Sequence, residues 1–350
     1  MEIGIFTFGE LTTDPYTGKQ LEPKARLREF LDLAKLADEA GLDVFGVGEH
    51  HRPDFAISSP AVVLAAAAEM TKQIKLTSTV TVLSTSDPVK VFEDFATVDL
   101  ISDGRAEITA GRGAYTESFP LFGYELSDYD QLFEEKLDLL LKINNSEKLT
   151  WSGKYRAPLA NAGVYPRPIQ QQIPLWIAIG GTPSSVVRAG RFGLPVYFAI
   201  LGQPTSFVQL ADLYHQAGAD AGHDPSSLKI GVTSHFYMEK TSQSARETFY
   251  PYYSRYIGAN MPSARGGPLP REAYEAWAAP QGALFVGSPQ EIIEKILWEH
   301  EILGHTRFLA QVGLGGLPFE QTAKSIELLA TEVLPVVRRE ISKENTSENK

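Results

Sequence analysis

Strand-like and helix-like segments alternate eight times along this chain, and this alternation limits its possible folds more than any other feature. The predicted strands are short and rich in apolar residues, at 3–6, 44–47, 74–83, 106–110, 175–179, 195–200, 228–237 and 306–312. Each precedes a segment of helical periodicity, at 24–40, 60–71, 88–102, 128–143, 182–192, 205–221, 288–303 and 318–338. Alternation of this kind predicts a parallel sheet, and eight units favour a closed (β/α)8 TIM barrel over an open doubly wound sheet.

The eight units follow one another without a break in composition, which predicts one domain over residues 1–340 and a polar, frayed tail over 341–350. Two insertions exceed the minimal repeat. Residues 144–172, after strand four, are polar and include a small hairpin near 151–155. Residues 250–282, after strand seven, are rich in proline, glycine and tyrosine. Loops after strands emerge on the catalytic face of a barrel, so we expect 250–282 to be a lid whose prolines prevent one continuous helix.

Composition excludes several classes of function. The chain has no cysteine, which excludes disulfides, thiolate metal sites and cysteine nucleophiles. Its net charge of −11 argues against nucleic acid or an anionic membrane as a partner. No apolar run approaches the roughly 18 residues of a membrane helix, and no targeting segment is visible, so we expect a cytoplasmic protein.

Ionisable side chains follow the second predicted strand, in Gly48-Glu49-His50-His51-Arg52. A cluster at a strand end lies at the catalytic face of a barrel, whereas a solvated loop with ion pairs is the plainer alternative. Neighbouring histidines on extended backbone point in different directions, and a metal would need a third ligand. We therefore predict no metal site, and a metal hydrolase on the same barrel stays a remote alternative.

Two further strand ends are suited to binding an anion. Strand four ends in Gly111-Arg112-Gly113, where an arginine fork stands on backbone that a ligand can approach closely. Strand five ends in Gly180-Gly181-Thr182-Pro183-Ser184-Ser185 and leads directly into a helix, whose N-terminus favours negative charge. Taken alone, each could equally be a tight surface turn.

In combination, these residues resemble a known family. Glu49-His50-His51, Asp99 to Arg105 and Gly111-Arg112-Gly113 are similar in order and spacing to the bacterial luciferase-like flavin monooxygenases. The turn at 180–185 and the segments Gly287-Ser288-Pro289 and Gly315-Gly316-Leu317-Pro318 also fit this family. The resemblance covers about residues 1–340, and the combination is specific although each piece alone is weak.

The resemblance implies a barrel that binds reduced FMN with its phosphate at the ends of strands four and five. By position, Arg112 would pair with the phosphate, and His50 matches the histidine that handles a proton during oxygen transfer. Thr79 and Val80 match the family position of a non-prolyl cis peptide beside the flavin ring. The implied cofactor contacts are Thr79, Val80, Arg112, Tyr115, Gly180, Gly181, Thr182 and Ser184.

The chain departs from the luciferase α-chain at two places. Gly111 stands where that chain has a reactive cysteine, and Gly180-Gly181 stands where it has a glutamate–serine pair. Light emission and an aldehyde substrate are therefore not supported. The resemblance implies instead an FMN-dependent monooxygenase that uses reduced FMN and O2 to oxygenate a small organic substrate. Phe8, Phe55, Tyr115 and Phe198 would line an apolar or aromatic pocket.

No nicotinamide fingerprint is present, so we expect a separate flavin reductase as the functional partner. A deazaflavin-dependent hydride-transfer enzyme of the same superfamily is one alternative, and a non-catalytic flavin-binding protein is another. We also predict a homodimer. The helix at 60–70 carries Val62, Val63 and Leu64 followed by four consecutive alanines, and is apolar nearly all round, which the outer helix of a monomeric barrel should not be.

Overall fold

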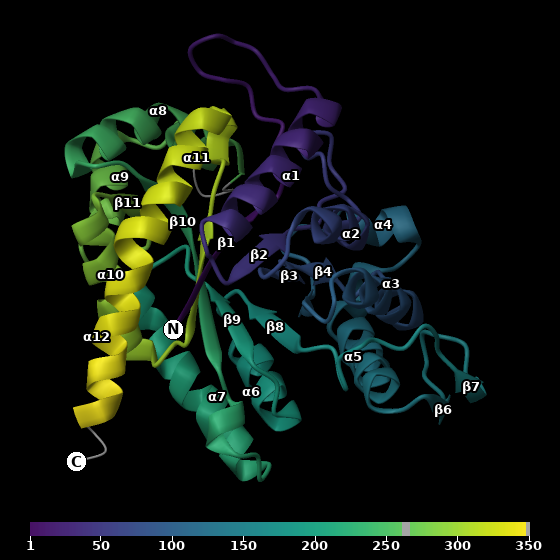
Figure 1. Cartoon of the computed structure of the whole chain (residues 1–350). Coiled ribbons are helices and arrows are strands. Elements are labelled where there is room, and N and C mark those ends of the chain that lie inside the picture. Colours follow the sequence, from purple (N-terminus) through teal and green to yellow (C-terminus); the bar gives the residue numbers. More distant parts are fainter. Residues whose placement is uncertain (261–266, 348–350) are drawn as a thin grey trace.

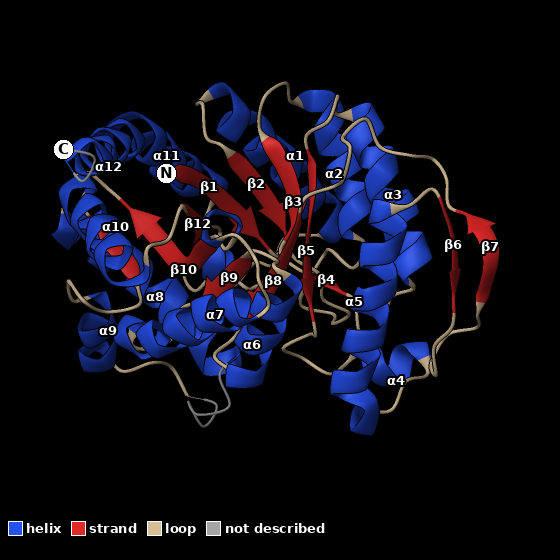
Figure 2. Cartoon of the chain, turned by 90° about the horizontal axis from the view of Figure 1, so that it is seen from below, coloured by secondary structure: helices blue, strands red, loops and turns tan. Residues whose placement is uncertain are grey.

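A closed barrel of parallel strands forms the centre of the molecule in the computed structural model, which describes residues 1–260 and 267–347. The strands of the ring, in the order in which they pair, are β1 (Glu2–Thr7), β2 (Val44–Val47), β3 (Lys75–Ser78), β5 (Ala106–Gly111), β8 (Leu175–Ile179), β9 (Val196–Ala199), β10 (Ile230–Met238) and β12 (Arg307–Gln311). β12 pairs with β1 and so closes the ring. Helices surround the strands in both cartoon views (Figure 1, Figure 2). The predicted (β/α)8 barrel is confirmed.

The helices that follow the strands pack on the outside of the barrel. They are α1 (Pro23–Glu39), α2 (Pro60–Met70), α3 (Pro88–Ile101), α5 (Tyr129–Asn145), α6 (Pro183–Phe192), α7 (Val208–Asp220), α10 (Pro289–Leu303) and α11 (Phe319–Leu328). Most of them begin with proline, which suits the first position because an amide hydrogen there needs no partner within the helix. No helix in the described part of the chain combines the length and the apolar character needed to cross a lipid bilayer.

Some elements differ from the predicted ones. The third strand is divided, because β3 ends at Ser78 and a short strand, β4 (Thr81–Val82), pairs separately with β5. The peptide bond between Thr79 and Val80, which lies between the two pieces, is cis. At the C-terminal end, α11 continues through a π-helical segment, η6 (Leu329–Val333), into α12 (Leu334–Ser347). Helix therefore extends into the residues for which a frayed tail is predicted.

The insertion after strand four contains the predicted hairpin in a wider form. Its strands are β6 (Lys148–Trp151) and β7 (Leu159–Gly163), so residues 152–158 make the connection. Figure 2 shows this hairpin at the edge of the molecule, away from the barrel. A short helix, α4 (Ser118–Phe122), and a 3-10 turn, η1 (Leu126–Asp128), lie between β5 and α5 and were not predicted.

The segment after strand seven is mostly helical but is not one continuous helix, and the tyrosines expected to cover the pocket lie elsewhere. α8 (Ser242–Asn260) passes through Pro251, and α9 (Arg271–Ala278) leads to an added strand, β11 (Phe285–Gly287). Tyr252, Tyr253 and Tyr256 are buried in an apolar cluster of these elements, so their rings fill a small core and are not free to cover a pocket. Pro262 and Gly266, on which the lid prediction also rested, lie outside the described residues.

Charged side chains close the N-terminal end of the barrel. Arg307 on β12 donates hydrogen bonds to Glu107 on β5 at 2.5 and 3.1 Å, and to Glu2 on β1 at 2.6 Å. It also donates to the Tyr197 hydroxyl on β9 at 2.8 Å, and Lys75 on β3 pairs with Glu2 at 2.5 Å. β5 and β12 are not neighbours in the ring, so the network crosses the interior.

An apolar layer lies next to this network. Its buried members are Phe6, Val44, Trp176, Tyr197 and Leu309. The Arg307 guanidinium lies 4.4 Å from the centroid of the Trp176 ring, which joins the two layers. The interior is therefore packed, and the C-terminal ends of the strands form a mouth, where (β/α)8 proteins carry their functional residues.

Candidate active site at the mouth of the barrel

His50, in the loop after β2, is the centre of the group of side chains at the mouth. Its Nδ1 lies 3.3 Å from Oε1 of Glu117. Its ring packs against Phe55, Phe8 and Tyr115 at centroid distances of 4.2, 4.7 and 5.0 Å. Burial lowers the pKa of His50, and the hydrogen bond with Glu117 acts in the opposite direction. A largely neutral imidazole with one nitrogen held by a carboxylate can exchange a proton at the other.

The loops that carry these aromatic side chains are joined to each other. Glu10 and Phe55 form an isolated antiparallel bridge, and the Ala56 amide donates to the Gly9 carbonyl at 2.9 Å. This pairing fixes Phe55 beside the loop that carries Phe8. The prediction that Phe198 lines this pocket together with Phe8, Phe55 and Tyr115 is wrong. Its neighbour Tyr197 faces the barrel interior, so Phe198 faces outward and packs on Phe207 at 5.3 Å.

His51 has a different partner from His50. Its Nε2 lies 2.8 Å from Oε1 of Glu49, and the other oxygen of Glu49 accepts a hydrogen bond from the Val82 amide at 3.0 Å. The hydrogen bond with Glu49 raises the pKa of His51. His51 and Glu49 therefore tie the loop after β2 to β4. In the described ranges, no group of three histidine, aspartate or glutamate side chains is placed to hold a metal ion.

Thr79 and Val80, on either side of the cis peptide, occupy space that two glycines leave open. A Cβ atom at Gly46 would lie 2.6 Å from Cγ2 of Thr79, and one at Gly111 would lie 2.6 Å from Cγ2 of Val80. The side chain of Val80, between β3 and β4, thus leaves room only for glycine at position 111. The buried hydroxyl of Thr79 has no hydrogen-bond partner among the described residues.

Arg112 extends from the end of β5 toward the turn after β8. Its Nη2 donates to the Thr182 hydroxyl at 3.3 Å, which brings together the two anion-binding motifs predicted separately from the sequence. Its Nη1 forms an ion pair with Asp130 at 2.6 Å, and its guanidinium lies 5.0 Å from the centroid of the Tyr129 ring. We call this group the Arg112 corner.

The turn after β8 leaves its backbone free for a ligand. Gly180, Gly181, Thr182 and Ser184 are all exposed, and a Cβ atom at either glycine would meet no other atom within 4 Å. Gly181 has a φ of +112°, in the region that favours glycine. Thr182 is the N-cap of α6, but its side chain makes no capping hydrogen bond. The amide groups at the start of α6, which begins beside the Arg112 corner, therefore have no side-chain acceptor at the N-cap.

Tyr115 lies with His50 and not with the Arg112 corner. Its hydroxyl donates to the Asn260 carbonyl at 3.4 Å, and the Arg52 guanidinium lies 4.8 Å from the centroid of its ring. Arg52 also forms an ion pair with Asp54 at 2.6 Å. Tyr115 thus belongs to the edge of the site where α8 ends.

A second buried polar group lies at the ends of β1 and β12, and the sequence analysis missed it. Glu10 accepts hydrogen bonds from the Thr7 hydroxyl and the Gln311 amide, both at 3.2 Å, and Arg26 lies 3.6 Å away. Burial raises the pKa of Glu10, against the opposing effect of Arg26. Nearby on β10, burial lowers the pKa of His235 to about 4.

Glu117 and Asp130 were also missed, although they hold the two residues on which the site depends. Both follow strand four in the sequence, Glu117 just before α4 and Asp130 in the first turn of α5. A search that extended beyond the first few residues after each strand would have included Glu117. Asp130 reaches Arg112 only because α5 packs beside the barrel, and no local sequence signal predicts that packing.

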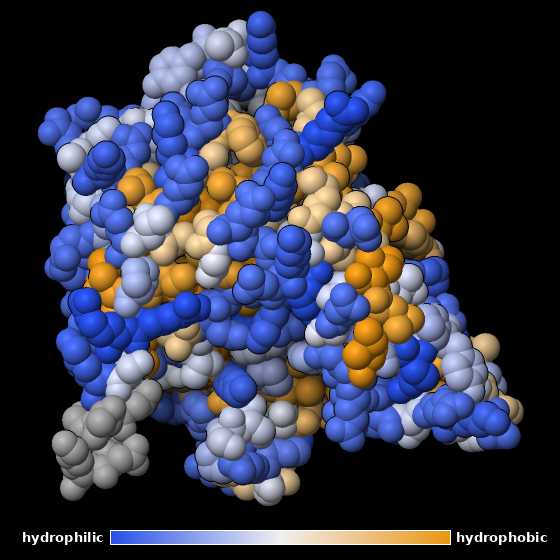
Figure 3. All heavy atoms as spheres, in the orientation of Figure 1, coloured by the Kyte–Doolittle hydropathy of each residue, from blue (hydrophilic) through white to orange (hydrophobic). Residues whose placement is uncertain are grey.

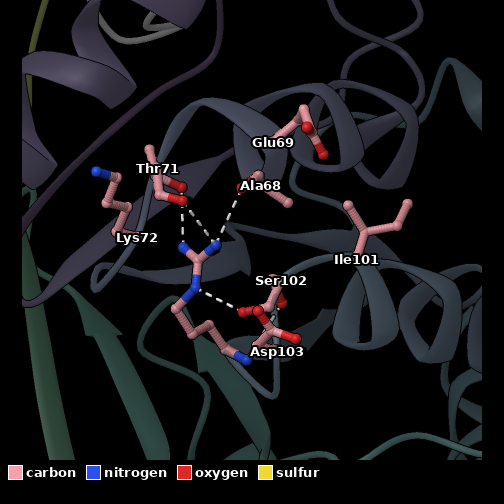
Figure 4. Close-up of a pocket in the computed structure, with 8 residues that line it drawn as sticks. Ala68, Glu69, Thr71, Lys72, Ile101, Ser102 and Asp103 are labelled. Atoms are coloured by element: carbon pink, nitrogen blue, oxygen red, sulfur yellow. Dashed lines mark hydrogen bonds between the residues drawn. The ribbon is translucent and has the colours of Figure 1, made fainter.

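A polar pocket lies at the opposite end of the molecule, among the loops that enter β3 and β5 (Figure 4). Arg105 stands at its centre and donates to the carbonyls of Ser102, Ile74, Ala68 and Thr71 and to the Thr71 hydroxyl, at 2.7 to 3.1 Å. These bonds use all five of its N–H groups. Arg105 therefore joins α2 to the start of two strands and has no donor left for a ligand.

Known proteins share both the sequence pattern and the fold. The family described as luciferase-like monooxygenase matches residues 1–306. The oxygenase component of flavin-dependent trigonelline monooxygenase from Acinetobacter baylyi is 25% identical over 359 residues, which cover 96% of this chain and 95% of that protein. Monooxygenase RslO1 from Streptomyces bottropensis has a TM-score of 0.83 at 25% identity, over 96% of this chain and 99% of that one.

Two further solved structures show the same fold with different cofactors in their names. The oxygenating constituent of 3,6-diketocamphane monooxygenase from Pseudomonas putida, in complex with FMN, has a TM-score of 0.76 at 21% identity, over 96% of this chain and 98% of that one. The coenzyme F420 dependent tetrahydromethanopterin reductase from Methanopyrus kandleri has a TM-score of 0.72 at 21% identity, over 96% of this chain and 100% of that one. At this identity, both likenesses concern the fold alone.

Proposed function

Because this chain belongs to the luciferase-like monooxygenase family, we propose that it uses reduced FMN and O2 to oxygenate a small organic substrate. One observation carries the proposal. The Arg112 corner, suited to an anion, and His50, suited to proton exchange among aromatic side chains, lie at the same mouth of the barrel. A cofactor with a phosphate at one end and a reactive ring at the other needs both.

The residues of the Arg112 corner fit a flavin phosphate. Arg112 would pair with it, and the amides of Gly180 and Gly181 and the hydroxyls of Thr182 and Ser184 would complete the contacts. The open space beside both glycines and the uncapped start of α6 support this assignment.

The ring of the cofactor would lie against Thr79 and Val80, with Tyr115 at its edge. The buried Thr79 hydroxyl that lacks a partner supports this placement, because a buried polar atom is expected to find an acceptor or donor in the working state.

When bound, reduced FMN supplies the electrons that activate O2, so that one oxygen atom enters the substrate and the other leaves as water. His50 is the proton-exchanging group. With Glu117 accepting from Nδ1–H, the lone pair lies on Nε2, which is the atom at which a proton is taken up or returned. Glu117 is a positioning residue, because it fixes the tautomer. Phe8 and Phe55 exclude water around the imidazole.

The proposal includes a separate flavin reductase. The relative from Acinetobacter baylyi is named an oxygenase component, and this chain carries no nicotinamide-binding fingerprint of its own. Reduced flavin would therefore arrive from solution or from a partner enzyme. The aromatic surroundings of His50 favour an apolar or aromatic substrate.

Ligand binding followed by oxygen consumption tests the proposal. Purified protein is titrated with FMN, riboflavin and coenzyme F420, and binding of FMN in preference to the other two is expected. The FMN-loaded protein with a flavin reductase and NADH should then consume O2 in a substrate-dependent manner, measured over a panel of aromatic and apolar compounds. Preference for F420 would contradict the FMN assignment and favour the deazaflavin alternative. Binding of FMN without substrate-dependent turnover across the panel would favour a non-catalytic flavin-binding protein.

A further inference from the structure

Two arginines and two carboxylates face each other at the Arg112 corner. Asp130 Oδ1 lies 2.6 Å from Nη1 of Arg112 and 3.8 Å from Nη2 of Arg188, a residue of α6. Arg188 also pairs through Nε with Glu134 at 2.7 Å. The side chain of Asp130 is 56% exposed, whereas that of Arg112 is 18% exposed. A carboxylate at the surface therefore contacts an arginine that stands largely within the site.

The position of Asp130 is fixed by the start of α5. Asp130 and Glu134 are four residues apart, so they lie on the same face of that helix and both reach α6. The preceding residue, Tyr129, donates its hydroxyl to the Gly113 carbonyl at 2.7 Å, which ties the start of α5 to the loop after β5. The Arg112 guanidinium packs against the same ring.

We propose that the Asp130 carboxylate is an internal competitor for the flavin phosphate, and that it sets how readily the flavin leaves. This inference rests on the proposed function. Arg112 donates from Nη2 to the Thr182 hydroxyl and from Nη1 to Asp130. A phosphate that takes the Nη1 donor must displace the carboxylate and then stand near its negative charge. Asp130 therefore opposes the binding of FMN, while keeping Arg112 extended toward the turn in its absence.

Such a competitor suits an enzyme that exchanges its cofactor. The ion pair is partly exposed, and exposed pairs are weak, so it can be replaced by a stronger dianion. The residual repulsion then lowers affinity and speeds release. Asp130 thus acts on affinity through Arg112 and takes no part in recognising the flavin.

The test measures the dissociation constants of FMN and riboflavin for four proteins by fluorescence titration. Asp130→Asn should tighten FMN binding by about threefold to tenfold, because the competing and repelling charge is gone. Riboflavin, which lacks the phosphate, should bind the variant as it binds the wild type. Asp130→Ala should change FMN affinity in the same direction. Glu134→Gln, the matched control, removes a carboxylate that pairs with Arg188 only and should change neither constant by more than about twofold.

The outcomes separate the inference from the function on which it rests. If the wild type binds FMN no better than riboflavin, the phosphate assignment is wrong and the inference is wrong with it. If the wild type prefers FMN but both Asp130 variants bind FMN no more tightly than the wild type does, the inference alone is wrong. Circular dichroism and thermal unfolding of each variant show whether α5 is intact.

Discussion

Arg112 is the residue whose replacement tests the phosphate site most directly. Arg112→Ala removes the guanidinium that reaches the turn after β8, so FMN binding should weaken by about 1.5–3 kcal/mol, the range for hydrogen bonds to charged groups. Fluorescence titration measures the change. Riboflavin affinity should be unaffected. The matched control is Arg191→Ala, which removes an exposed arginine from α6, the helix that follows this turn. Equal loss for both ligands would contradict a role at the phosphate.

The state of His50 predicts the pH dependence of turnover. Burial lowers its pKa, so the neutral imidazole should persist below the ordinary histidine value of about 6.5, and the acidic limb of kcat should lie below that value. Glu117→Gln removes interactions that raise the pKa, so the limb should move to still lower pH while kcat falls. His50→Ala should lose about 10²–10⁴ in turnover and keep FMN affinity within a few-fold.

Profiles of kcat against pH for the wild type and Glu117→Gln check this prediction. Glu125→Gln, an exposed glutamate in the same connection, should leave the profile unchanged. An acidic limb that moves upward in Glu117→Gln, or does not move, would show that Glu117 does not act through His50.

For single residues, the sequence predicts best those positions that follow directly from the order of strands in a barrel. His50, Arg112 and Gly181 stand soon after strands, so the barrel rule was sufficient to place them at the mouth, while their roles stay predictions. It could not provide their partners. Glu117 and Asp130 reach the site through α4 and α5, whose packing depends on the whole fold, and Tyr115 proved to be a neighbour of His50 instead of Arg112.

Among the elements, the strands at the closed end of the barrel depend on Arg307. Arg307→Met leaves Glu107 buried without its main partner, so the free energy of unfolding should fall by about 3–5 kcal/mol. Urea denaturation measures the loss. Lys142→Met, which breaks an exposed pair with Asp138 at 2.7 Å, should cost no more than about 1 kcal/mol. Similar losses for the two variants would show that the network contributes no more than a surface pair.

Most helix and strand positions could be predicted because amphipathic periodicity and proline at helix starts are local signals. Pro251 shows where local signals fail. Proline usually interrupts a helix, yet α8 continues through it because Phe249, Tyr252 and Tyr253 are buried on either side. Tertiary packing outweighs the local preference there. The division of the third strand into β3 and β4 is equally invisible in its β-branched sequence.

The whole molecule is predicted to be a homodimer. On α2 the exposed residues include Val62, Ala66 and Met70, and the end of α3 adds exposed Leu100 and Ile101. Figure 3 shows apolar atoms gathered over the side of the molecule where α2, α3 and α4 lie. An apolar surface of this kind on several neighbouring helices is typical of an interface.

Ala66→Glu should therefore give a monomer, which light scattering coupled to gel filtration would detect at micromolar concentration. Ala219→Glu places the same charge at an exposed alanine of α7 and should leave the dimer intact. A wild type that elutes as a monomer would contradict the prediction, as would an Ala66→Glu dimer of unchanged stability.

The charged closure of the barrel has a consequence for protein engineering. Arg307 and its partners tie together strands at the end remote from the mouth, so the scaffold has an anchor that no loop at the mouth supplies. Mutational libraries confined to the loops that carry Phe8, Phe55 and Tyr115 leave this anchor untouched. Such libraries would vary the mouth while the Arg307 network still ties the strands together, and the same separation would let natural lineages diversify the loops at the mouth.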